Sequence, residues 1–166
     1  MPLNNLAHDS PHNPVDVVER LAATHDWSFS RASDDEVTIL VRGQWSDYQL
    51  SFTWMPDVEA LHVACSFALK IPERRRGEAI ELCALINQQL WVGHLDAWLN
   101  DGIIMFRHAI VLTAGIAATD AQCEAVLNIA LDTCERHYQG FQFVVWAGRK
   151  PREALDSIMF ETSGQA

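Results

Sequence analysis

Apolar and polar residues alternate with a period of two in three consecutive segments of the chain, and this pattern constrains the fold most. Val37, Ile39 and Val41 occupy alternate positions of the first segment, and residues 48–54 and 61–69 repeat the pattern. Successive side chains of a β-strand point to opposite faces, so each segment buries one face and leaves the other more polar. The turn-forming sequences GQWSD and MPDVE separate the segments. The pattern therefore predicts an antiparallel meander with one face on a core.

Helical spacing of apolar residues replaces this alternation on both sides of the predicted meander. Asn13 before Pro14 is typical of a helix start, because Asn caps free N–H groups and proline lacks one. Further starts are predicted at Pro72, near Thr119 or the next residue, and at Pro151. The predicted elements are a helix from residue 14, strands near residues 27–31, 37–41, 48–54 and 61–69, a helix over 73–91, a hairpin within 91–110, and helices from about 119 and 151. This order, α-ββββ-α-ββ-α-α, is that of an α+β fold with an antiparallel sheet.

The sequence allows two conformations at the end of the third helix. The segment HYQGFQFVVWAG either continues the helix, with a kink, past Gly140, or ends it there and forms a strand over residues 140–147. The continued helix is the favoured interpretation.

Length and charge limit the domain organisation and the classes of partner. A chain of 166 residues is most simply one domain, and we expect a flexible tail at 1–13, one domain at 14–160 and a second flexible tail at 161–166. The formal net charge of −10 argues against nucleic acid and anionic membranes as partners. The N-terminal sequence has no basic region followed by an apolar one, so no signal peptide is recognised and a cytoplasmic location is expected.

The densest group of charged and apolar residues lies in WVGHLDAWLNDGIIMFRHAI, residues 91–110. The sequence NDG between two apolar runs is a strong hairpin signal, because Asp-Gly accepts the positive φ angles of a type I′ turn. A two-residue loop places Asp96 directly opposite Arg107, with Trp98 opposite Met105, whereas a three-residue loop separates the two charges. Since opposite charges facing each other stabilise a hairpin, the first register is preferred, and Asp96 and Arg107 are interpreted as a structural pair.

The sequence contains no recognisable catalytic, cofactor-binding or metal-binding motif. Glycine-rich phosphate loops, GxSxG, HExxH and CxxC are all absent. The four cysteines are isolated and are expected to be reduced and buried, although Cys123 lies near a helix start that could lower its pKa. We therefore predict no catalytic residue, no cofactor and no metal ion.

Two features are candidates for partner contact. Arg74, Arg75 and Arg76 form the most basic spot of an acidic chain, and they lie in the first turn of a helix, where the dipole disfavours cations. Trp98 and Met105 share the more polar face of the hairpin, and exposed aromatic residues are typical of interfaces. Trp45, Trp98 and Trp146 are the tryptophans expected at exposed positions.

The sequence LINQQLWVGHLDAWLNDGIIMFRHAIVL, residues 85–112, resembles the YbjN-domain family, which is described as bacterial sensory transduction regulators. The later segment FQFVVWAGRKPREAL is similar to the C-terminal part of that family, and the order of elements agrees from about residue 14 to 160. The resemblance implies a fold like that of type III secretion chaperones, a twisted antiparallel sheet flanked by helices and commonly dimeric. It carries over no catalytic residue.

The leading functional hypothesis is a non-enzymatic homodimer in bacterial signalling or stress response that acts by binding a protein or peptide. The alternative is a small-ligand sensor with a pocket between the sheet and the helices. A true secretion chaperone comes third, and an enzyme comes last.

Overall fold

The computed structural model describes the backbone of residues 13–163 and the side chains of residues 13–160. The elements follow one another in the predicted order, with two short 3-10 turns added. Their bounds are α1 Pro14–Thr24, β1 Ser28–Ser33, β2 Glu36–Arg42, β3 Asp47–Met55, η1 Pro56–Val58, β4 Ala60–Lys70, η2 Glu73–Arg75, α2 Arg76–Asn87, β5 His94–Trp98, β6 Ile103–Val111, α3 Asp120–Val145 and α4 Pro151–Ser163. The α+β class and the predicted order are confirmed.

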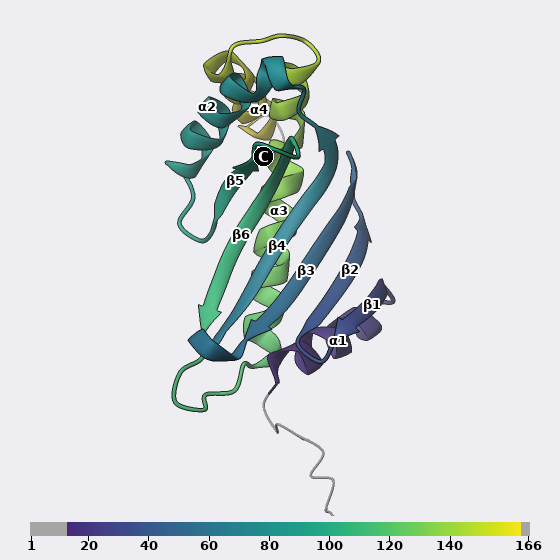
Figure 1. The fold of residues 1–166 in the computed structure, drawn as a ribbon. Coiled ribbons are helices and arrows are strands. Elements are labelled where there is room, and N and C mark those ends of the chain that lie inside the picture. The colour runs from purple at the N-terminus through teal and green to yellow at the C-terminus, as the bar shows by residue number, and fades with distance from the viewer. Residues whose placement is uncertain (1–12, 164–166) are drawn as a thin grey trace, which may run out of the picture.

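The six strands form one antiparallel sheet in the order β1-β2-β3-β4-β6-β5, so β1 and β5 are its edges. Helix α3 runs along the back of the sheet in Figure 1, against β4 and β6. Helices α2 and α4 lie at the upper end, and α1 packs against β1, β2 and β3 at the lower end (Figure 1). The face of the sheet turned toward the viewer in Figure 1 carries no helix, and we call it the open face.

The predicted alternation produces the core on the face that α3 covers. The strand register aligns one apolar residue from each of five neighbouring strands in a row, and each is at most 2% exposed. The row consists of Ile39, Leu50, Cys65, Phe106 and Leu95. Residues between these positions point to the open face and are half-buried or exposed. The two faces of the sheet therefore follow directly from the period of two.

Helix α3 continues past Gly140 to Val145, which resolves the boundary in favour of the continued helix. Thr119 begins it with a capping box, because its side chain accepts from the Gln122 N–H while the Gln122 side chain accepts from the Thr119 N–H. A Cβ atom at Gly140 would lie 3.2 Å from Ile158 of α4. Glycine at this position therefore lets α4 pack closely against α3.

The second helix differs from the prediction at both ends. Residues Glu73–Arg75 form a 3-10 turn, and α2 extends only from Arg76 to Asn87 rather than over 73–91. The helix ends where the Asn87 side chain bonds to the backbone of β5. At the other end of the chain α4 reaches Ser163, three residues past the expected domain end, and the remaining parts of the predicted tails, 1–12 and 164–166, lie outside the described residues.

The predicted hairpin register is wrong. Trp98 pairs with Ile103, so the loop has four residues, and Asp96 faces Met105 while His94 faces Arg107. Gly102 alone in this loop has a positive φ, +66°, whereas a type I′ turn requires two such residues. Its carbonyl accepts from the Ile71 N–H at 2.7 Å, which ties the loop to the end of β4. Because the register differs by two residues, every side chain stays on its predicted face.

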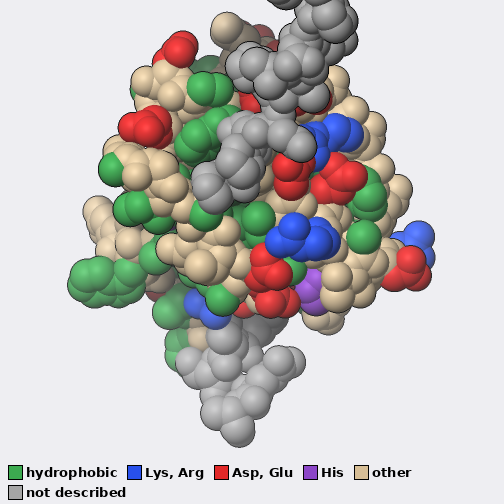
Figure 2. Space-filling view, turned by 90° about the horizontal axis from the view of Figure 1, so that it is seen from below, with side chains coloured by type: hydrophobic (Ala, Val, Ile, Leu, Met, Phe, Trp, Pro, Cys, Tyr) green, Lys and Arg blue, Asp and Glu red, His purple; other side chains and the backbone are tan. Residues whose placement is uncertain are grey.

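The lower end of the molecule combines apolar residues with paired charges. Seen from below, it shows apolar side chains among acidic and basic ones that lie next to each other (Figure 2). One such pair joins α1 to the start of α3, with Arg20 and Asp120 2.8 Å apart. The exposed apolar residues of the loops at this end include Val58 and Ile116.

Gly93 is required where the chain enters β5. Its φ is +71°, and a Cβ atom there would lie 2.2 Å from the Cζ atom of Phe106, which is fully buried. We expect Gly93→Ala to lower the free energy of unfolding by about 3 kcal/mol, from backbone strain and core overpacking together. Urea denaturation measures the loss.

Gly115 provides the matched control for this prediction. Its φ is +73°, but no atom lies within 4 Å of a Cβ atom placed there. Gly115→Ala should therefore cost only the backbone strain, about 1 kcal/mol. Equal losses in the two variants would contradict the role assigned to Phe106.

Candidate functional site

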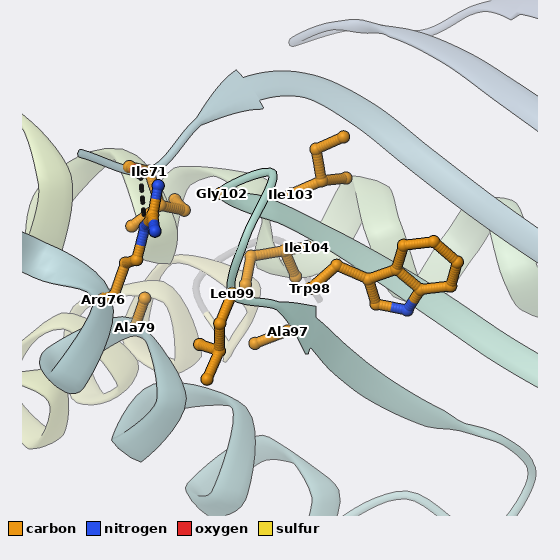
Figure 3. A pocket seen from close by; sticks show the side chains of 9 residues that line it. All are labelled: Ile71, Arg76, Ala79, Ala97, Trp98, Leu99, Gly102, Ile103 and Ile104. Carbon is orange, nitrogen blue, oxygen red and sulfur yellow. Dashed lines mark hydrogen bonds between the residues drawn. The ribbon is translucent and has the colours of Figure 1, made fainter. Parts of the chain in front are cut away.

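Trp98 and Met105 lie on the open face, near the end of the β5–β6 hairpin. Both belong to the set of hairpin residues that points away from the core, and Trp98 is 47% exposed. In the close-up of Figure 3 the indole of Trp98 points away from Leu99 and Ala79, which lie on the side of α2. The hairpin therefore presents a large aromatic group to solvent on the face that no helix covers.

A polar network lies beside these two residues and joins three strands. Arg107 of β6 donates from Nη1 to Asp96 Oδ2 of β5 at 2.9 Å and from Nε to His62 Nε2 of β4 at 3.2 Å. The two charged residues are diagonal neighbours rather than directly opposite. Each has a side chain about one-third exposed, so the pair is partly shielded from water.

His62 is the uncharged member of this network. A guanidinium group has only donors, so the Nε2 atom of His62 must carry a lone pair to accept its hydrogen bond. Burial lowers the pKa of His62, and the nearby Arg107, His94 and His108 lower it further. His62 therefore holds Arg107 in place as a neutral acceptor.

The three arginines of the basic triplet have different environments. Arg74 is exposed. Arg75 pairs with Glu78 at 2.9 Å and packs against Gly148, and its Nε is buried without a hydrogen-bond partner within the described residues. Arg76 donates to the Ile71 carbonyl at 3.4 Å (Figure 3). Of the three arginines, Arg74 is therefore the most accessible to a partner.

A cleft of about 280 Å³ separates α2 from the edge strand β5. Beside it lies a hollow of about 10 Å³, enough for about one water molecule (Figure 3). The cleft falls just below the usual volume of ligand pockets, roughly 300–1,000 Å³, and it is open to solvent. It is lined by Ile80, Cys83, Ala84, Asn87, Leu95, Asp96, Ala97 and Leu99.

Asn87 closes one end of this cleft by acting as a substitute for a neighbouring strand. Its side chain donates to the Leu95 carbonyl at 2.9 Å and accepts from the Leu95 N–H at 2.7 Å. These are the two hydrogen bonds that a paired strand would supply at Leu95. The backbone of β5 is therefore already satisfied at this position, which protects the edge of the sheet.

The cysteine thiols have the properties of buried apolar groups. All four are buried and free. Burial raises the pKa of Cys83 to about 12 and that of Cys123 to about 11, so the helix start does not activate Cys123. Within residues 13–163, no three His, Cys, Asp or Glu side chains lie close enough together to bind a metal ion.

The exposed tryptophans expected from the sequence are exposed in the structure, and one more was missed. Trp45, Trp98 and Trp146 all present large apolar surface to solvent. Trp91 is 99% exposed, although the sequence places it at the end of a predicted helix. The early end of α2 at Asn87 leaves Trp91 in the following turn, and no local signal in the sequence reveals this.

Asn87→Ala removes both hydrogen bonds to Leu95 and leaves its backbone groups without their partner. We expect the free energy of unfolding to fall by about 1–3 kcal/mol and the Leu95 amide to exchange its hydrogen faster. Urea denaturation and hydrogen exchange measure the two effects. Gln88→Ala, at an exposed neighbouring position, should change stability by less than about 0.5 kcal/mol, and an equal effect of both variants would contradict the edge-capping role.

Comparison with solved structures identifies the fold. A chain in the crystal structure of the ExsC–ExsE complex matches with a TM-score of 0.54 and 16% identity, over 74% of this chain and 88% of that one. YbjN from E. coli matches with a TM-score of 0.53 and 7% identity, over 73% of this chain and 85% of that one. The open antiparallel sheet with four helices thus resembles the ExsC chaperone fold, as expected.

Three further findings concern the chain rather than the site. Within residues 13–163 no helix is both long and apolar enough to cross a bilayer. No curated protein matches the sequence.

Residues 14–143 match the family YbjN, described as "Putative bacterial sensory transduction regulator". Because this match covers most of the chain, the protein belongs to the YbjN family.

Proposed function

We propose that this protein is a cytoplasmic, non-enzymatic adaptor that regulates another protein by binding it, and that it acts as a homodimer. The YbjN family and the chaperone-like fold support a regulatory or adaptor role. The high pKa of the buried thiols supports a role without nucleophilic cysteine chemistry.

The observation that carries the proposal is the apolar surface of Trp98 and Met105 on the open face. Tryptophan and arginine are among the residues that most often dominate the free energy of protein binding. Here Trp98 lies on the same face as Arg107, whose charge is positioned by Asp96 and His62. The protein that shares this fold in the ExsC–ExsE complex is itself bound to another polypeptide, which supports this type of activity. A segment with apolar side chains fits this surface, and Arg74 offers a second, basic contact.

The proposed homodimer uses a different surface, the side of α2 and β5. Ile80 of α2 and Leu99 of the hairpin loop are exposed large apolar residues that line the same open cleft. In a two-fold symmetric contact both copies use the same patch, so one apolar patch is sufficient for dimer formation. The backbone groups of Leu95 are already bonded to Asn87, so at this residue the contact relies on side chains.

Partner capture tests the binding surface. The tagged protein, used to capture partners from a lysate of the native cell, should repeatedly recover one polypeptide. The double variant Trp98→Ala with Met105→Ala should reduce its recovery about tenfold or more, as truncation of a binding hot spot does. Trp45→Ala is the control, because Trp45 has a similar exposed fraction, 43%, but lies between β2 and β3. Unchanged recovery by the double variant would contradict the proposal.

Light scattering at micromolar concentration tests the homodimer. The wild-type protein should show the mass of two chains, and Ile80→Glu with Leu99→Glu should show the mass of one, because burying like charges at a symmetric contact is unfavourable. Val58→Glu, at an exposed apolar position of the lower end, should leave the dimer intact. A wild-type protein with the mass of one chain would rule out the homodimer.

A further inference from the structure

Three side chains that are positive or can become positive lie together on the open face. Arg107 of β6 faces His94 of β5 directly and is hydrogen-bonded to His62 of β4. His108, the next residue of β6, is close enough to lower the pKa of His62. It pairs with Val63, however, and so belongs to the opposite face of the sheet. We call His62, His94 and Arg107 the basic triad.

Few negative charges oppose this triad. On β5 its partner is Asp96, which is bonded to Arg107. On β3 the residue facing His62 is the uncharged Thr53, and the next strand, β2, places Glu36 opposite Thr53. With both histidines neutral, Arg107 and Asp96 cancel, so the surface carries no net charge at this point. Each proton bound by a histidine then adds one positive charge.

The geometry of the network means that protonation of His62 breaks its hydrogen bond with Arg107. The His62 Nε2 atom accepts from Arg107, which remains protonated at all physiological pH values. A protonated imidazole has two donors and no acceptor, so this hydrogen bond cannot persist once His62 is charged. Acidification therefore replaces an attraction between two strands by a repulsion, and Arg107 keeps only Asp96 as its partner in the network.

The direction of the pKa shift supports neutrality of His62 at neutral pH. Burial is the largest cause of its lowered pKa, and Arg107, His94 and His108 add to it. The pKa of His108 is lowered by burial and by His94. Once His62 is protonated, it is repelled by Arg107 and by any neighbouring histidine that is also charged. An external anion would relieve that repulsion.

We propose that the basic triad is a pH-operated site for carboxylate groups of an acidic, partly apolar peptide, closed near neutral pH and opened when His62 is protonated. This inference rests on the proposed function, because it assigns a regulation to the surface that contains Trp98 and Met105. The chain as a whole has a net charge of −10, so acidic partners are repelled elsewhere. The triad then selects a segment that presents carboxylates and apolar side chains on the same side, since the apolar contacts lie immediately beside it on the same face.

Fluorescence anisotropy tests the site with a peptide of repeated Asp-Ser-Leu-Ser units, which in extended form has Asp and Leu on the same side and which carries a pH-insensitive rhodamine label. The pH range runs from 7.5 to 5.0, because the pKa of His62 is lowered by burial. Asp stays almost fully ionised over this range, so the charge of the probe is nearly constant. The dissociation constant for the wild-type protein should fall about tenfold over this range, as two additional weak ion pairs, one to each histidine of the triad, would produce. His62→Gln with His94→Gln should abolish most of this gain, because glutamine still offers an acceptor to Arg107 but never becomes charged.

His25→Gln is the matched control, because His25 lies at the end of α1, away from the triad, and is partly exposed. It should retain the pH-dependent gain, which separates the triad from the general rise in charge on acidification. Equal gains in the control and in the double variant would overturn the proposal, and so would pH-independent binding or no binding of the peptide by the wild-type protein. NMR of the imidazole nitrogens adds an independent readout, and a protonated Nε2 on His62 at pH 7.5 would also overturn it.

The two proposals can fail separately. If Trp98→Ala with Met105→Ala loses the captured partner but the peptide shows no pH-dependent gain, the regulation is wrong and the binding surface stands. If the peptide shows the gain but the captured partner does not depend on Trp98 and Met105, the carboxylate site exists and the proposed function of this surface is wrong.

Discussion

The packing of α3 against one face of the sheet is the interaction on which the rest of the structure depends. A row of buried side chains crosses five strands and meets the apolar side of this long helix. The β2–β3 turn is joined to the same helix, because the Glu135 carboxylate accepts from the Gln44 N–H and the Tyr48 hydroxyl. With the helices gathered behind the sheet and at its ends, the opposite face remains uncovered. The surface proposed for binding is therefore a direct consequence of one-sided packing.

Much of the fold could be predicted because its signals are local. The alternation in β2, β3 and β4, the Asn13 cap and the capping box at Thr119 each depend on residues a few positions apart. The hairpin register could not be predicted, because it depends on the bond between Ile71 and Gly102, which are distant in sequence. The end of α2 was missed because Asn87, at which the helix ends, bonds to Leu95 of the next strand, and no helix-ending residue marks this position. Local patterns specify which face a side chain occupies, and long-range hydrogen bonds select the register.

In the candidate site, too, local patterns could be predicted and long-range contacts could not. The sequence correctly assigns Asp96 and Arg107 to one face of the hairpin, since a register difference of two residues preserves the face. It could not reveal His62 as the third member of the network, because His62 lies 45 residues before Arg107 and reaches it only through the pairing of β4 with β6. The arginine triplet is also divided by tertiary contacts. Arg75 packs against Gly148, in a loop far along the chain, and only Arg74 remains exposed.

The carboxamide of Asn87 has a consequence for the specificity of any contact made along β5. An extended chain that approached Leu95 would find its donor and acceptor already occupied. Recognition at Leu95 must discriminate between amino-acid sequences, because this residue has no free backbone donor or acceptor to offer to every peptide alike. The same single side chain that ends a helix thus disfavours amyloid-like growth at Leu95, and it adds to the protection that the charge of Asp96 gives the strand.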